Sequence, residues 1–130
     1  MTALYEVQVR RIYEAPLETD GTRILVDRLW PRGLTKEKAH VDEWCKTIAP
    51  SAELRKWYGH DPRLFEEFSR RYLRELEEPQ LAAVLSRLRE LARQGPLTLL
   101  TATKQPDLSE AAVIRTVIQE NLQQDSPDTG

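Results

Sequence analysis

The chain has 130 residues, of which 40% are hydrophobic and 31% charged, and its 19 basic and 21 acidic residues leave a formal net charge of −2. A chain of this length buries about two-thirds of the surface that it exposes when unfolded, which is enough for one hydrophobic core. Because it has five glycines, one cysteine and no apolar run near the ~20 residues of a spanning helix, we expect neither a collagen-like chain, nor a disulfide scaffold, nor a membrane protein.

Two strands are predicted near the start of the chain. Residues 5–13 alternate apolar and polar side chains, which is the pattern of a half-buried strand. Residues 15–22 contain a proline and a glycine and predict a turn. The short apolar run within residues 23–30 predicts a more deeply buried strand, which Pro31 ends because proline has no N–H to donate to a sheet.

Residues 35–94 have a helical pattern. Asp61 and Pro62 predict a helix start, because the carboxylate caps free amides and proline suits the first helical position. A second helix is predicted from Pro79 to a glycine-proline stop. Cys45 also falls in this region, and we expect it to be a buried structural thiol because nothing nearby favours a thiolate. The predicted N-caps are Thr35, Ser51 and Asp61.

One more strand and one more helix complete the pattern. Residues 97–102 form an apolar run typical of a buried strand, and Asp107 with Glu110 resembles a capping box opening a helix that runs to residue 122. Residues 123–130 are polar and predict a disordered tail. We therefore predict a small layered single α/β domain over residues 1–122, with a short mixed or parallel sheet and four to five helices.

The most unusual group of side chains lies at the carboxyl end of the second predicted strand. Ligands of open α/β sheets bind beyond the carboxyl ends of the strands, which is where Asp27 and Arg28 are expected. Since neighbours on a strand point to opposite faces, these two cannot simply pair with each other. In the following loop, Arg32 can clamp an anion and Gly33 lets backbone amides turn toward it.

A purely structural role for the same cluster stays open at this point. Asp27 would then cap a neighbouring loop, Arg28 would pair with a helix glutamate such as Glu75, and Trp30 would pack in the core. Structural ion-pair networks perturb charged groups as functional sites do, so the residue types alone do not separate the two explanations.

Three further residues extend the candidate site. Arg55 and His60 lie close together in the chain, and an imidazole can act as acid, base or hydrogen-bond donor near neutral pH. Without a partner, however, a surface or structural role is the more common one for a histidine. Lys104 follows the third predicted strand and shares a sheet edge with Asp27 if the second and third strands are adjacent and parallel. A solvated loop lysine is the alternative.

The sequence lacks the motifs of several common metal, nucleotide-binding and catalytic sites. One cysteine and two histidines provide no zinc-site spacing, and neither a dinucleotide fingerprint, nor a phosphate loop, nor a nucleophile elbow occurs. We therefore predict no cofactor and no metal, although these motifs do not address magnesium bound by carboxylates. The 14 arginines outnumber the 5 lysines, and a guanidinium binds carboxylates and phosphates bidentately. Arginines on the helices are expected to pair with neighbouring glutamates.

Three segments of the chain are distinctive: GTRILVDRLWPRGLTKE at 21–37, APSAELRKWYGHDP at 49–62 and FSRRYLREL at 68–76. They resemble the bacterial YeaO-like family, the domain of unknown function 488. A wider related group tends to carry a cysteine near the end of the late strand and a Cys-His-Arg element opening the last helix. Residues 101–104 (TATK) and 109–111 (SEA) stand there in this chain, so the resemblance does not imply cysteine chemistry. The matching positions are Asp27, Arg28, Trp30, Pro31, Arg32, Gly33, Arg55, Trp57, His60, Asp61, Tyr72 and Glu75.

These features predict a protein that binds a small anionic ligand, nucleotide-like or phosphorylated, at the strand-end edge of the sheet. The alternative is a non-enzymatic protein-interaction module whose arginine and tryptophan motifs are structural. The near-balanced charge argues against a nucleic-acid partner, and the lone cysteine without a secretory-type start favours the cytoplasm. Enzymatic activity and oligomeric state stay open. The predicted ligand-binding residues are Asp27, Arg28, Arg32, Gly33, Arg55, His60 and Lys104.

Overall fold

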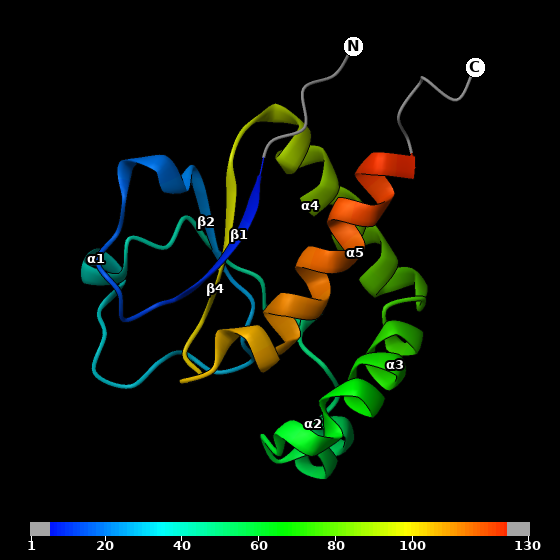
Figure 1. Ribbon diagram of the computed structural model, residues 1–130. Helices are drawn as coiled ribbons and strands as arrows, with labels where there is room; N and C mark the ends of the chain where they lie inside the picture. The colour runs from blue at the N-terminus through cyan, green and yellow to red at the C-terminus, as the bar shows by residue number, and fades with distance from the viewer. Residues whose placement is uncertain (1–5, 125–130) are drawn as a thin grey trace.

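A four-stranded parallel sheet lies at the centre of the computed structural model, which describes residues 6–124 and the side chains of residues 6–120 (Figure 1). The strand order is β1-β4-β2-β3, and every neighbouring pair is parallel. The predicted α/β fold is therefore confirmed. The strands are β1 (Val7–Arg11), β2 (Thr22–Leu25), β3 (Glu43–Trp44) and β4 (Leu97–Thr101). The α-helices are α1 (Lys36–Ala39), α2 (Ala52–Tyr58), α3 (Phe65–Glu75), α4 (Pro79–Gln94) and α5 (Glu110–Gln124).

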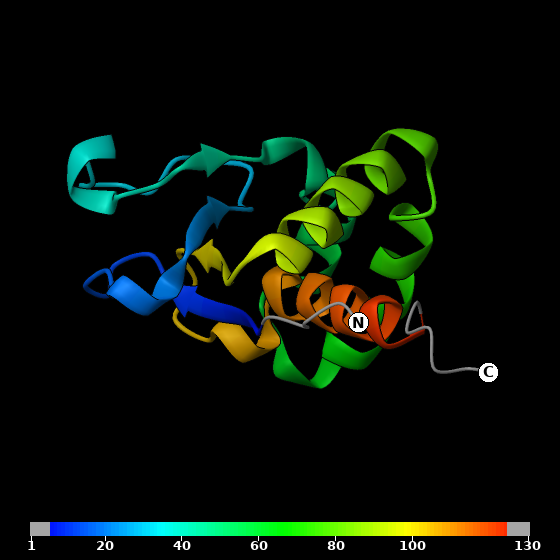
Figure 2. The ribbon, with the colours of Figure 1, turned by 90° about the horizontal axis from the view of Figure 1, so that it is seen from above.

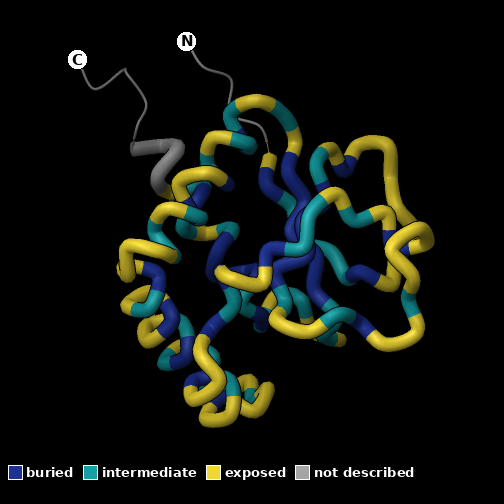
Figure 3. Tube along the Cα trace, turned by 180° about the vertical axis from the view of Figure 1, so that it is seen from behind, coloured by how far each residue is buried: buried dark blue, intermediate teal, exposed yellow. Residues whose placement is uncertain are grey.

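The two faces of the sheet carry different layers (Figures 1 and 2). On one face, Leu99 packs in a large core with side chains of α2, α3, α4 and α5. On the other face, Leu100 packs in a smaller core with Ala39 of α1 and the loop residue Trp30. Successive strand residues point to opposite faces, and β4 is covered on both, so all five of its residues are buried. Figure 3 shows these buried strands inside largely exposed loops and helix surfaces.

The long helices follow from their apolar spacing and their caps. Phe68 and Tyr72 lie one turn apart on the buried side of α3, and the Phe68 ring stacks on Tyr58 of α2 with centroids 4.3 Å apart. α4 begins at Pro79 as predicted. The predicted caps also form: the side chains of Thr35, Ser51 and Asp61 accept hydrogen bonds from backbone N–H groups two or three residues on.

A buried ionic group fastens the strands on the α1 side. Asp20 is 1% exposed, and its carboxylate accepts hydrogen bonds from Arg10 of β1 and Arg23 of β2. The Arg23 guanidinium also donates to the carbonyl oxygens of Ala39 and His40, each at 3.0 Å. Asp20 and Arg23 thereby connect β1 and β2 to the end of α1.

The structure differs from the sequence prediction around β2 and β3. Residues 35–94 contain β3, a strand of two residues, and Cys45 directly follows it instead of lying in a helix. Cys45 is buried as predicted, and burial raises the pKa of its thiol. β2 ends at Leu25, five residues before the predicted end, so Asp27 and Arg28 lie in the loop beyond the strand. The expectation that they point to opposite faces of a strand is therefore wrong.

The start of the last helix is also corrected. Asp107 lies in a short 3-10 helix (Pro106–Leu108), and α5 begins only at Glu110, so the predicted capping box does not form. α5 continues to Gln124, beyond the predicted helix end at 122. Residues 125–130 of the predicted tail lie outside the described residues.

Candidate functional site

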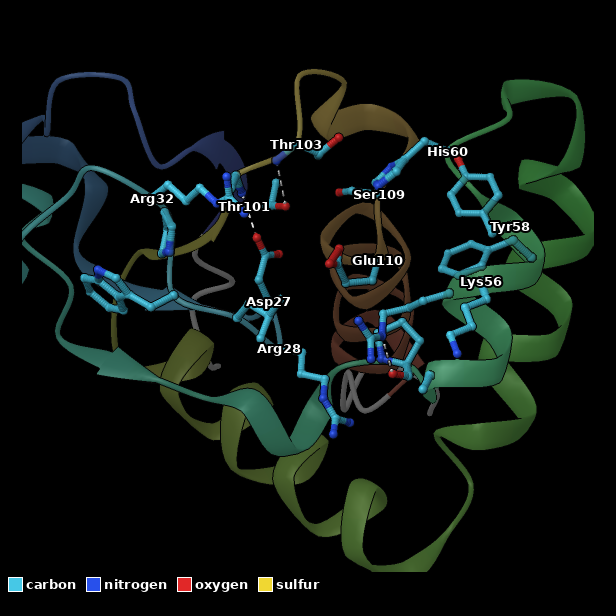
Figure 4. A pocket seen from close by; sticks show the side chains of 18 of the residues that line it. Asp27, Arg28, Arg32, Lys56, Tyr58, His60, Thr101, Thr103, Ser109 and Glu110 are labelled. Atoms are coloured by element: carbon cyan, nitrogen blue, oxygen red, sulfur yellow. Dashed lines mark hydrogen bonds between the residues drawn. The ribbon is translucent and has the colours of Figure 1, made fainter.

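A cavity of about 640 Å³ opens at the edge of the sheet where the strands end (Figure 4). The loops that follow β2 and β4 form one side, and α2 and the first turn of α5 form the other. Because all the strands run in one direction, their carboxyl ends meet at this edge, which is where open α/β sheets bind ligands. The volume lies within the ~300–1,000 Å³ that is typical of small-molecule sites.

Asp27 is fixed at this edge by the neighbouring strand. Its Oδ2 accepts a hydrogen bond of 2.8 Å from the backbone N–H of Ala102, the first residue after β4. Its backbone carbonyl accepts a second one, also 2.8 Å, from the indole N–H of Trp44. The other carboxylate oxygen, Oδ1, is buried and has no hydrogen-bond partner in the described part of the chain. A buried acceptor without a partner costs stability, so Oδ1 calls for a protonated neighbour or a ligand.

Glu110 is the neighbour that faces Asp27. It is the first residue of α5, and Figure 4 shows the two carboxyl groups pointing toward each other across the middle of the cavity. Burial, together with the charge of Asp27 and hydrogen bonding to it, raises the pKa of Glu110 well above its ordinary value. Two facing carboxyl groups resist double ionisation, so the favoured state of the pair holds one proton.

Sequence reasoning missed Glu110 as a site residue. Its spacing from Asp107 suggests a helix cap, and no local pattern places it beside Asp27, which lies far away in the chain. Only the packing of α5 against the strand ends brings the two together.

Cationic side chains line the same cavity without forming ion pairs among the described residues. Tyr13 helps to hold the Arg32 backbone, donating a hydrogen bond of 3.0 Å from its hydroxyl to the carbonyl of Arg32. The Nε–H of Arg55 donates to the carbonyl of Pro50 at 3.2 Å. None of the four cations forms an ion pair within residues 6–120. The four are Arg28, Arg32, Arg55 and Lys56, the last of which was not predicted.

Arginines on the α3 surface behave differently. Arg70 and Arg71 both pair with Glu67, as the sequence predicts for neighbouring charges on a helix. Glu75, the partner considered for Arg28, instead accepts hydrogen bonds from the backbone N–H and the hydroxyl of Ser51, at 2.8 and 2.6 Å. Arg70 and Arg71 therefore have a carboxylate partner, which the four cations of the cavity lack in the described chain.

The remaining predicted residues are only partly brought together. His60 lines the cavity, has a left-handed backbone with φ of 58°, and also lines a second, adjoining cavity. Lys104 lies in that second cavity beside Arg11 and not in the first. Gly33 has φ of 79° and supports the turn of the loop, but it does not line either cavity.

Trp30 has a structural role within the loop that follows β2. Its ring packs edge-on against Trp44 with centroids 5.5 Å apart, and its indole N–H donates to the carbonyl of Leu34 at 2.7 Å. This part of the loop therefore positions Asp27 and the nearby arginines while packing against the sheet.

Among the described residues there is neither a metal-binding cluster nor a membrane-spanning helix. Between residues 6 and 120, no three His, Cys, Asp or Glu side chains gather in a way that would hold a metal ion. Among the helices that the structure describes, none combines the length and the apolar character needed to cross a bilayer.

Comparison with known proteins places the chain in a family. A family model described as "Inactive DUF488-N3 subclade" matches residues 6–130. The uncharacterised protein Rv3073c of Mycobacterium tuberculosis is 46% identical over 108 residues, which cover 83% of this chain and 89% of that protein. The uncharacterised protein YeaO of Escherichia coli is 41% identical over 108 residues, which cover 83% of this chain and 92% of that protein. No solved structure matches. The chain belongs to the YeaO-like DUF488 family.

Proposed function

We propose that this protein binds a small anionic ligand, phosphorylated or nucleotide-like, in the strand-end cavity. The observation that carries this proposal is the group of four cations, Arg28, Arg32, Arg55 and Lys56, which line the cavity and form no ion pair within the described side chains. Like charges gathered around one cavity repel each other, and a bound anion relieves that repulsion. Guanidinium groups also suit phosphate oxygens, to which they donate two parallel hydrogen bonds.

Two further points support binding without turnover. The matching subclade is described as inactive. This chain also has threonine, alanine and lysine at the end of the late strand, where the wider group resembled by the sequence carries a cysteine. We infer a cytoplasmic location for such a protein, because its lone cysteine is a buried free thiol, as is common in a reducing compartment.

Thermal unfolding with a panel of anions tests the proposal. The probes are inorganic phosphate, pyrophosphate, ribose 5-phosphate and the nucleoside 5′-monophosphates. A probe at a hundred times its Kd adds about 2.7 kcal/mol of stability and raises Tm by several degrees. Arg28→Gln and Lys56→Gln should each weaken that shift, whereas Arg74→Gln, which changes an exposed arginine of α3 outside the cavity, should not.

Two results would end the proposal. One is a wild-type chain whose Tm responds to none of the probes. The other is a shift of equal size in the Arg28→Gln/Lys56→Gln double variant and in the Arg74→Gln control, because the anion would then bind elsewhere.

The interaction module is the second candidate, and Leu29 supports it. This residue lines the cavity from the loop after β2 and is 71% exposed, more than any other large hydrophobic side chain among the described residues. If the loop docks a protein, Leu29→Asp should abolish co-purification of that protein while leaving Tm unchanged. Retention of the partner by this variant would count against the module.

A further inference from the structure

The carboxyl pair and the cations share one cavity but do not neutralise each other. Asp27 and Glu110 form no ion pair with any described cation, although four cations line the same space. An anionic group held by the cations would be repelled by ionised carboxylates. A ligand that fills the cavity must therefore present a different chemistry to Asp27 and Glu110.

Two of the hydroxyl groups that line the cavity, those of Tyr58 and Ser109, already donate to backbone carbonyls. Tyr58 donates its hydroxyl hydrogen to the carbonyl of Leu108 at 2.6 Å, and Ser109 donates to the carbonyl of Pro106 at 2.6 Å. Asp27 Oδ1 has no hydrogen-bond partner in the described structure. The proton of Glu110 and a group on the ligand are available as its donors.

Resting on the proposed function, we propose that Asp27 and Glu110 form a subsite for a neutral amide-type edge, such as that of a nucleobase, carried by the ligand whose anionic group the cations bind. One ionised and one protonated carboxyl group offer an acceptor beside a donor. An edge with an N–H next to a carbonyl or ring nitrogen matches that arrangement, as it does in carboxyl–base recognition generally. The burial of Oδ1 favours such a partner, because each unpaired polar atom there would cost binding energy.

A cationic amine is the competing chemistry, and pH separates the two. A neutral edge needs the proton on the pair, so its binding weakens as pH rises through the raised pKa of Glu110. An ammonium group needs both carboxylates ionised, so its binding strengthens instead. His60 is an ionisable residue that lines the same cavity, and a His60→Gln background removes its contribution. The charged and titratable groups around the pair are Arg28, Arg32, Arg55, Lys56, Tyr58 and His60.

Calorimetric titration of the full chain provides the test, with ribose 5-phosphate as the reference probe. We expect at least one nucleoside 5′-monophosphate to bind about tenfold or more tightly than ribose 5-phosphate, since two paired polar atoms are gained. Glu110→Ala should reduce this preference to near unity. Glu110→Gln keeps a neutral donor and acceptor, so it should retain the preference but lose its pH dependence. Glu53→Gln, an exposed glutamate on α2 outside the cavity, is the matched control.

Each outcome separates this inference from the proposed function. If ribose 5-phosphate binds as tightly as every nucleotide while Arg28→Gln weakens both, the anion site stands and the amide-edge subsite is refuted. A preference for the nucleotide over ribose 5-phosphate that rises with pH in the His60→Gln background also refutes the subsite, because the ratio cancels the titration of the phosphate group that both probes carry. If no phosphorylated probe binds at all, both proposals fall. Loss of the preference in Glu110→Ala with retention in Glu110→Gln supports the subsite.

Discussion

Replacing Asp20 by asparagine tests the ionic group that connects β1 to β2. The Asp20 carboxylate accepts hydrogen bonds from Arg10 at 3.0 Å, from Arg23, and from the backbone N–H of Leu17 at 2.9 Å. Asparagine keeps the shape of the side chain but removes its charge. Two guanidinium groups then lose their counter-ion, and the side chain of Arg23 is only 5% exposed.

The expected loss of stability is large for a single isosteric change. Removing one partner of a buried ion pair costs about 3–5 kcal/mol, a substantial part of the ~5–15 kcal/mol that stabilises an ordinary domain. For a chain of this size the corresponding fall in Tm is about 10–15 °C. Burial alone would raise the pKa of Asp20, but hydrogen bonds from Leu17 and Arg23 and the charges of Arg10 and Arg23 outweigh it and lower the pKa below 3.8.

The lowered pKa fixes the pH range of the effect. The stabilisation is fully present above pH 3.8 and is lost as pH falls through the lower folded-state pKa. Urea unfolding should therefore show the same gap between wild type and Asp20→Asn at about pH 5 and at about pH 7, and a narrower gap in stronger acid. Asp107→Asn, an exposed change, should have little effect. A gap below ~1 kcal/mol at neutral pH would refute the reasoning, because that is the range of an exposed ion pair.

Three further changes test the backbone, the core and the cavity. Gly21→Ala should lower the free energy of unfolding by at least ~3 kcal/mol in urea, because φ is +65° and the new Cβ would lie 2.1 Å from the carbonyl oxygen of Pro96. Tyr72→Phe should cost about 1–3 kcal/mol by the same assay, since the carbonyl of Ile48 loses its buried donor; an unchanged midpoint would contradict this. Glu110→Gln should become more stable relative to wild type as pH rises above 4.5. The raised pKa of Glu110 means that its protonated form stabilises the folded wild type, and this stabilisation is lost as the proton leaves. Parallel pH profiles of the two proteins in thermal unfolding would argue against this.

Elements with a repeating local pattern could be predicted from the sequence. β4 is an apolar run, and α3 and α4 have apolar residues at three- and four-residue spacing. In each element these are the residues that become buried, so the local sequence is enough to predict the element. β3 could not be predicted in this way, because a strand of two residues has no period. Glu43 and Trp44 are extended because they pair with Ile24 and Leu25 of β2, which is a property of the assembled sheet.

The sequence predicts those residues of the candidate site that directly follow a strand. It does not predict a residue that reaches the site through the packing of a helix. Asp27 follows a strand, and the rule for open parallel sheets places it at the ligand edge. Lys104 also follows a strand, but the direction of its loop carries it into the adjoining cavity. Glu110 became part of the site only because α5 packs with its first residue against Asp27, and no spacing within the chain encodes that contact.

Ion pairs distinguish several structural arginines from the cations of the cavity. Arg10 and Arg23 pair with Asp20, and Arg70 and Arg71 pair with Glu67, whereas the cations of the cavity have no carboxylate partner in the described chain. The whole chain carries a formal net charge of −2, so its overall field does not attract anions from a distance. Affinity for an anion must then come from the cations of the cavity itself, acting within about 10 Å at ordinary salt concentrations. For the proposed anion site, the raised pKa of Glu110 favours one proton on the pair that it forms with Asp27, which lowers the negative charge of the pair from two to one and so weakens its repulsion of the ligand.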